Sequence, residues 1–154
     1  MSKKLKSELP GILVEELCKT TPRLNAVLLI AVDKEGFPHI ALLSYFEFIF
    51  RHAKLYYFIN NSSRTCKYIG QSGKCSLCFI QKNFVYYVKA RCEEVTKFGQ
   101  WTVFRADGLT VLEDFPQPSE GEVFVQTGIR FCSSYREIQR RLSLREAIVQ
   151  QIQE

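Results

Sequence analysis

The chain has 154 residues, of which 46% are hydrophobic and 24% are charged, and its formal net charge is +5. That length fits a single domain over residues 1–154, which can bury a core without disulfides or metal ions. No apolar run reaches the ~20 residues that cross a bilayer, and no hydrophobic signal core follows the basic start of the chain. We therefore expect no membrane partner and no export.

The arginines and cysteines narrow the function further. The C-terminal quarter is rich in arginine, but glutamates are interleaved and no nucleic-acid motif accompanies them, so we expect no nucleic-acid partner. Six cysteines are scattered rather than spaced as a disulfide framework, which favours a reducing, cytoplasmic setting. The CxxC from Cys75 to Cys78 lies in a predicted strand, where residues three apart face opposite sides. We expect buried thiols there and no metal site.

The first half of the chain predicts a helix followed by three strands. The helix is expected near residues 10–19, and the apolar, partly β-branched run at 26–32 predicts a strand buried on both faces. A polar turn ending in glycine leads into a second strand at 37–48, so these two strands form a hairpin. A third strand at 54–60 ends in asparagine, and a short helix is expected at 65–71.

The second half predicts further strands and a C-terminal helix. Strands at 75–81 and 84–95 are separated by a tight turn, which makes five strands of one antiparallel meander. Residues 101–104 fit a strand or a helix, and residues 114–121 are typical of a surface loop. We expect a sixth strand at 122–131 to close the sheet. From Ser134 onward, apolar residues at helical spacing predict an amphipathic helix.

Residues 60–65 carry the clearest chemical suggestion in the chain. Hydroxyls, a guanidinium and the free amides of a helix N-terminus converge there just after a strand end. The helix dipole favours an anion, the first amides lack partners within the helix, and Arg64 can donate two hydrogen bonds to a phosphate. Lys67 adds charge in the first turn. In the competing interpretation, Ser62 or Ser63 only caps the helix and Arg64 is solvated.

The order of these elements resembles the pyridoxamine 5'-phosphate oxidase-like superfamily, with Ser63-Arg64-Thr65 after the third strand and Lys89-Ala90-Arg91-Cys92-Glu93-Glu94-Val95 ending the fifth. The resemblance spans roughly residues 26–95 and extends to 131. It implies a mainly β fold with flanking helices: a six-stranded antiparallel split β-barrel with a C-terminal amphipathic helix. It also implies FMN as the cofactor.

The family's motifs map onto named positions of this chain. A Ser-Arg-Lys triplet holds the FMN phosphate in the family, and Thr65 here replaces its lysine, which keeps a donor and loses a charge. The family lays the flavin ring along an Arg-x-Val-Leu-Leu-Lys segment of the second strand, matched at 39–44. The implied cofactor-binding residues are His39, Ile40, Ala41, Leu42, Leu43, Ser44, Ile59, Asn60, Ser63, Arg64, Thr65 and Lys67.

Two departures count against the family's best-known reaction. True pyridoxamine phosphate oxidases bind the substrate phosphate with the lysine that ends the second-strand motif, and this chain has Ser44 there. They also use an Arg-x-His motif near the C-terminus, and the nearest match, Arg130-Phe131-Cys132, lacks the histidine. We therefore do not expect the chain to oxidise pyridoxamine phosphate, and no catalytic side chain is assigned.

Three functions stay open. The first is an FMN-dependent oxidoreductase that takes electrons from NADH or NADPH, in a homodimer whose interface completes the cofactor site. The second is a non-catalytic flavin-binding or sensing module, because the substrate residues of the characterised oxidases are missing. The third is a split barrel that holds haem or a deazaflavin, for which His39 and His52 are the only histidine ligands in the sequence.

Overall fold

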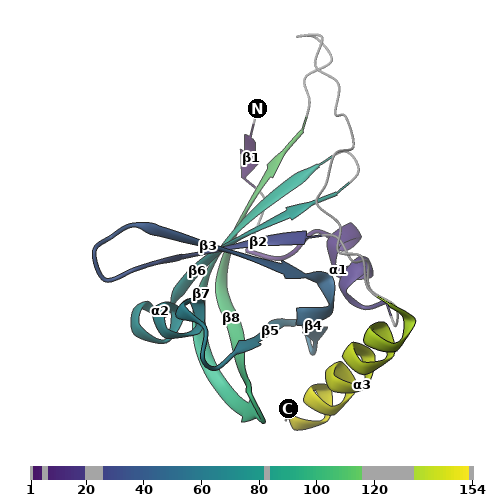
Figure 1. The fold of residues 1–154 in the computed structure, drawn as a ribbon. Coiled ribbons are helices and arrows are strands. Elements are labelled where there is room, and N and C mark those ends of the chain that lie inside the picture. The colour runs from purple at the N-terminus through teal and green to yellow at the C-terminus, as the bar shows by residue number, and fades with distance from the viewer. Residues whose placement is uncertain (1, 5–6, 20–25, 82–83, 116–133, 153–154) are drawn as a thin grey trace.

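The computed structural model describes residues 2–4, 7–19, 26–81, 84–115 and 134–152, which form a curled antiparallel sheet with helices packed on it (Figure 1). None of the described helices is long and apolar enough to cross a bilayer. The strands are β1 (Ser2–Lys4), β2 (Ala26–Val32), β3 (Pro38–Ser44), β4 (Phe48–Arg51), β5 (Lys54–Asn60), β6 (Lys74–Ile80), β7 (Val85–Phe98) and β8 (Trp101–Asp114). The helices are α1 (Gly11–Leu17), α2 (Arg64–Ser72) and α3 (Tyr135–Gln151), with a short 3-10 turn, η1 (Tyr45–Glu47).

The long hairpin of β7 and β8 connects the two halves of the sheet. The strand order is β3-β2-β6-β7-β8-β5-β4, and β1 pairs with β8 outside this path. On one side, β8 pairs with β7 along its whole length. On its other side, residues 101–106 of β8 pair with β5 and residues 112–114 of β8 pair with β1. The β2–β3 and β4–β5 hairpins therefore lie at opposite ends of the strand order.

Irregular pairing within this hairpin bends the sheet. The register of β7 against β8 shifts between Lys89 and Arg91 and again between Glu94 and Thr96. At the first shift β8 carries an extra residue, and Gly108 adopts a left-handed φ of 57°. A glycine in this conformation is typical of a β-bulge, which kinks the strand and increases its twist.

The inner side of the curled sheet holds the main core. Alternate residues of the strands point into it, so β2 contributes Val27, Leu29 and Ala31, while Leu28 and Ile30 between them face outward. Helices α1 and α2 add apolar side chains from Leu13, Leu17 and Ile69. Aromatic rings fill the centre, in the pairs Phe48–Phe79, Tyr57–Phe104 and Tyr45–Phe79. Each fully buried side chain of this size contributes about 1.5–3 kcal/mol.

The outer side of the sheet is covered over one half only. Helix α3 packs Ile148 and Ile152 against the outward residues Ile49, Tyr56, Phe58 and Val103 of β4, β5 and β8. The outer side of β3, β2, β6 and the adjoining part of β7, here called the bare half, has no such helix among the described residues. Large apolar side chains are exposed on it, including Val32, Ile40, Leu42 and Tyr87.

Arg145 holds α3 to the rest of the molecule. Its guanidinium donates hydrogen bonds to the carbonyl oxygens of Tyr45, Phe46 and Phe48, and to that of Leu17 at 2.9 Å. These acceptors lie at the end of α1 and around η1, so a single side chain joins three elements. Burial lowers the pKa of the guanidinium to about 10, which leaves it protonated at neutral pH.

The observed sheet corrects the predicted one in strand number and order. The three helices are present where expected, and the pairing is antiparallel throughout the described residues. The expectation of a five-stranded meander closed by a sixth strand is wrong, because seven strands form the path and β1 adds an eighth. Residues 101–114 form a full strand, which the ambiguous pattern at 101–104 did not identify. The strand predicted at 122–131 lies outside the described residues.

The strand predicted at 37–48 is interrupted, which is a second correction. Ser44 and Glu47 form a capping box that opens η1: the Ser44 amide and hydroxyl both donate to the Glu47 carboxylate. These hydrogen bonds turn the chain after β3 and separate that strand from β4. The signal was present in the sequence as Ser-x-x-Glu, but the surrounding aromatic residues favoured a continuous strand.

Gly108→Ala should lower the free energy of unfolding by about 1 kcal/mol, because a side chain disfavours the left-handed backbone at the bulge. Gly70→Ala provides the matched control. Gly70 lies inside α2 with open space where a Cβ would be, so alanine there should stabilise by about 0.5–1 kcal/mol. Urea unfolding midpoints measure both changes. Equal midpoints for the two variants would contradict a strained Gly108.

Arg145→Met should destabilise the fold by about 1.5–3 kcal/mol, the scale of hydrogen bonds that involve a charged group. The substitution keeps much of the side-chain volume but leaves buried carbonyls without a donor. Arg140→Met is the control, since the Arg140 guanidinium is exposed and pairs with Glu137 on its own helix. That change should stay within about 0.5 kcal/mol. A destabilisation of similar size in both variants would show that the hydrogen bonds of Arg145 do not stabilise the fold.

Candidate functional site

The connection between β5 and α2 is a tightly hydrogen-bonded turn. The side-chain oxygen of Asn60 accepts from the Ser62 amide at 2.9 Å and from the Ser62 hydroxyl at 2.7 Å. Ser63 is the N-cap of α2, because its hydroxyl oxygen accepts from the Cys66 amide at 3.1 Å. The capping that the sequence left as the competing interpretation is therefore real, and it sets the direction in which α2 begins.

Asn61 ties this turn to the tip of the β7–β8 hairpin. Its backbone amide donates to the carbonyl of Gln100 at 2.8 Å, and its side-chain amide donates to that of Gly99 at 3.1 Å. Its side-chain oxygen accepts from the Thr102 hydroxyl. The start of α2 is consequently held by a neighbouring hairpin as well as by its own turn.

Hydrogen-bond donors that could bind an anion remain available at the start of α2. The amides of Arg64 and Thr65 have no hydrogen-bond acceptor among the described residues. The side chains of Arg64 and Lys67 are exposed, and no carboxylate of the described residues pairs with either. Free amides, the positive end of the helix dipole and two unpaired cations together favour a phosphate-sized anion at this point.

The structure brings this turn next to the predicted ring-binding strand. His39 of β3 contacts Thr65 of α2, with 3.1 Å between the imidazole Nε2 and the hydroxyl oxygen. The same imidazole packs edge-on against the ring of Tyr68, one turn further along α2, at a centroid distance of 5.3 Å. Two segments 26 residues apart, both identified from the sequence, therefore meet at one place.

Strand β3 is an edge strand, which matters for ligand access. It pairs with β2 on one side, and no described strand pairs with its other side. Its outward side chains Ile40 and Leu42 are 61% and 45% exposed. An edge of this kind offers free backbone N–H and C=O groups beside apolar side chains, a combination that suits a flat heteroaromatic ring.

Several of the predicted site residues have other roles in the structure. Ile59 is 3% exposed and belongs to the main core, and Leu43 packs against that core. The Ser44 hydroxyl is occupied by Glu47, and the Asn60 side chain is occupied by Ser62. Ala41 follows Ile40 on β3 and is half-buried. Tyr68 was missed, although its spacing of three residues from Thr65 places both on one helix face.

The two histidines lie on different edges of the sheet. His39 is on β3, whereas His52 is in the β4–β5 turn with a left-handed φ of 50°. The Nε2 atom of His52 accepts a hydrogen bond from the Arg51 guanidinium at 2.9 Å. In the described residues no cluster of three or more histidine, cysteine or acidic side chains could hold a metal ion.

The CxxC cysteines face different surroundings, as strand alternation predicts. Cys75 lies in the main core, and its sulfur is 3.3 Å from that of Cys92 and 3.7 Å from the Tyr57 hydroxyl. Hydrogen bonding from Cys75 lowers the pKa of the Cys92 thiol, and burial raises that of Cys78. The partner of Cys75 is thus a residue on the next strand, which no short motif indicates.

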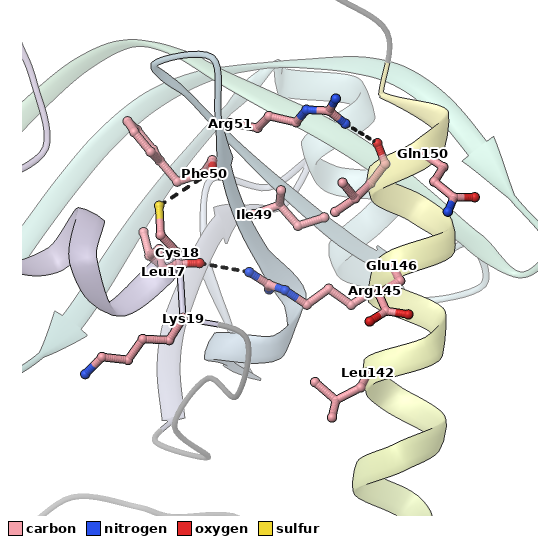
Figure 2. A pocket seen from close by; sticks show the side chains of 11 residues that line it. Leu17, Cys18, Lys19, Ile49, Phe50, Arg51, Leu142, Arg145, Glu146 and Gln150 are labelled. Atoms are coloured by element: carbon pink, nitrogen blue, oxygen red, sulfur yellow. Dashed lines mark hydrogen bonds between the residues drawn. The ribbon is translucent and has the colours of Figure 1, made fainter.

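A groove of about 560 Å³ between α1, β4 and α3 was not foreseen (Figure 2). Its apolar wall comes from Leu17, Ile49, Phe50, Leu142 and Val149. Two of its cations are engaged: Arg145 donates to the Leu17 carbonyl and Arg51 to that of Val149. Because these guanidiniums donate to backbone carbonyls, they serve the packing of α3 against α1 and β4.

Comparison with known proteins identifies the fold. No family model matches the sequence, and no curated protein matches it. A solved structure described as a putative pyridoxamine 5'-phosphate oxidase from Lactobacillus delbrueckii has a TM-score of 0.56 at 18% identity, covering 71% of this chain and 98% of its own. The chain therefore shares the split-barrel fold of this structure.

A second split barrel widens the range of ligands found on this fold. HutZ from Vibrio cholerae, described as a haem storage protein, has a TM-score of 0.51 at 14% identity. The match covers 70% of this chain and 96% of that one. Identities this low establish the architecture of a split barrel, and the ligand has to be argued from the residues themselves.

Proposed function

We propose that this split barrel binds FMN, with the phosphate at the start of α2 and the flavin ring along the free edge of β3. The contact between His39 and Thr65 is the observation that carries the proposal, because it brings the free hydrogen-bond donors at the start of α2 beside that edge. The Lactobacillus delbrueckii structure, described as a putative pyridoxamine 5'-phosphate oxidase, shares the fold and supports a site for a phosphorylated molecule.

The residues present fit the phosphate group. Arg64 supplies a fork of donors for two phosphate oxygens, and Lys67 supplies a second charge one turn along the exposed side of α2. Thr65, which stands where the family has lysine, is 5% exposed and bonded to His39. Its hydroxyl therefore positions β3 against α2, and the positive charge of the site comes from its neighbours.

The side chains present suit positioning of a cofactor rather than acid–base chemistry. FMN would supply hydride or electron transfer, and NADH or NADPH is the proposed donor. The exposed side chains of Ile40 and Leu42 would give the ring an apolar neighbour, and the free backbone edge of β3 would hydrogen-bond its polar atoms. Ser44, capped on Glu47, offers no charge to a substrate phosphate.

We also propose a homodimer formed through the bare half. Exposed apolar side chains gathered on one surface mark interfaces in soluble proteins. Leu28 and Ile30 of β2 lie opposite Leu42 and Ile40 of β3, so these residues form a continuous apolar strip beside the proposed ring position. A second copy on this strip would cover the ring from the side that one chain leaves open.

A haem-binding barrel is the alternative that the likeness to HutZ raises. Its requirement is an imidazole nitrogen free to bind iron. The Nε2 atoms of His39 and His52 each have a hydrogen-bonding partner, Thr65 and Arg51 respectively, so iron binding through Nε2 would require either histidine to give up that contact. The absorbance spectrum of the purified protein separates the two cofactors directly.

Arg64→Ala should weaken FMN binding by about 1.5–3 kcal/mol, because it removes charge-assisted hydrogen bonds to the phosphate. Fluorescence quenching of FMN on titration with apoprotein measures the change. Arg136→Ala is the control, since Arg136 is also exposed but lies on α3. Unchanged affinity in the Arg64 variant would place the phosphate elsewhere. Oxidation of NADPH by the FMN-loaded protein then distinguishes an oxidoreductase from a non-catalytic flavin module.

Leu42→Asp should convert the dimer to a monomer, because it puts a charge into the centre of the apolar strip. Ile12→Asp introduces the same charge at a comparably exposed residue of α1 and should leave the dimer intact. Sedimentation equilibrium gives the masses of both variants. A monomeric wild-type protein, or a dimer that survives Leu42→Asp, would refute the proposed interface.

A further inference from the structure

A basic cleft of about 440 Å³ lies on the outer side of the sheet, at the opposite end of α2 from Arg64. Three cationic residues line it: Lys74 on β6, and Lys89 and Arg91 on β7. Its remaining walls come from hydroxyl-bearing, small and apolar residues of α2, β2, β6, β7 and β8. No aspartate or glutamate is among the residues that line it.

Strand register places the three cations side by side. Lys74 lies directly opposite Arg91 across the β6–β7 pair, and Lys89 lies opposite Ser76 in the same pair. On its other side Lys89 lies opposite Thr110 of β8. Like charges facing each other across two strands destabilise a sheet, so this arrangement has a cost unless an anion offsets it.

The bulge at Gly108 shapes the floor of this cleft. It falls between Lys89 and Arg91, where β8 carries its extra residue. The aliphatic part of Arg91 lies against Gly108, since a Cβ added there would be 3.7 Å from the Arg91 Cδ. Bulges of this kind occur often beside binding sites, because they re-aim the side chains next to them.

These cations are unpaired within the described part of the chain. None of the three makes an ion pair or side-chain hydrogen bond there, unlike Arg105, which contacts two carboxylates. The acidic residue nearest in register is Asp107, opposite Arg91, and its carboxylate accepts from Arg105 at 2.6 Å. The positive charge of the cleft is therefore available to a ligand.

We propose that this cleft binds a phosphorylated small molecule through Lys74, Lys89 and Arg91. Three cations match the two or three negative charges of a phosphate or pyrophosphate, and the hydroxyls of Ser76 and Thr110 are further donors. Val32, on the β2 side of the cleft, is suited to contact an apolar part of the same molecule. The volume is that of a small-ligand site rather than of an extended polymer groove.

This site does not depend on the proposed FMN site. The cleft includes Ser72 at the C-terminal end of α2, whereas the FMN phosphate is proposed at the first turn, beside Arg64. The Ser72 hydroxyl is already used, since it accepts from the Lys74 amide and donates to the Lys74 carbonyl. That turn holds Lys74 in place beside the cleft.

Pyrophosphate titrated into the 15N-labelled full-length protein tests the proposal by amide chemical-shift mapping. Shifts are expected in residues 74–76, 89–91 and 108–110, with an affinity that falls as salt is added. Arg91→Gln and Lys89→Gln should each weaken binding at least about 10-fold, because each removes a charge-assisted contact. Lys54→Gln removes the same charge at the other end of the strand order and should leave the affinity unchanged.

The same spectra show whether each variant is folded, so a loss of binding cannot be mistaken for unfolding. Shifts confined to residues 62–66 and abolished by Arg64→Ala would assign pyrophosphate to the start of α2 and overturn the proposal. So would the absence of shifts at millimolar pyrophosphate, or an affinity that Arg91→Gln and Lys89→Gln leave unchanged. Shifts at the cleft that persist in Arg64→Ala would establish it as a separate site.

Discussion

The bulged hairpin of β7 and β8 is the constraint on which the rest of the molecule depends. Each strand has 14 residues, and together they connect the β2–β3 side of the sheet to the β4–β5 side. A regular hairpin of this length would continue as a twisted ribbon without a kink. The left-handed residue at Gly108 and the two register shifts kink it instead, so the sheet curls around one core.

The curl also decides what each side of the sheet does. Its inner side is closed by α1 and α2, and its outer side is covered by α3 over β4, β5 and β8. Arg145 fixes α3 there by holding carbonyls from α1 and from the region of η1. The bare half is left with an apolar strip on β2 and β3 and with cations on β6 and β7. The proposed dimer interface and the proposed basic cleft therefore both lie on the bare half, which the helices do not cover.

The two proposed anion sites lie at opposite ends of helix α2. Its first turn carries Arg64 and unpaired amides, and it contacts β3 through Thr65 and His39. Its last residue, Ser72, borders the cleft that contains Arg91. In a flavoprotein, these two positions would let a phosphorylated cofactor and a phosphorylated ligand bind at opposite ends of one short helix. Neither arrangement needs a charged group to move, because the cations are already exposed.

Local patterns in the sequence determined the helices, most of the strands and the capped, basic start of α2 at residues 63–67, since capping, alternation and charge act between near neighbours. They also indicated the split-barrel resemblance, which the fold confirms. The pairing of β5 with β8, the contact of His39 with Thr65 and the partnership of Cys75 with Cys92 were decided only by tertiary structure. His39 and Thr65 are 26 residues apart and Cys75 and Cys92 are 17 residues apart, so patterns among near neighbours do not indicate these contacts.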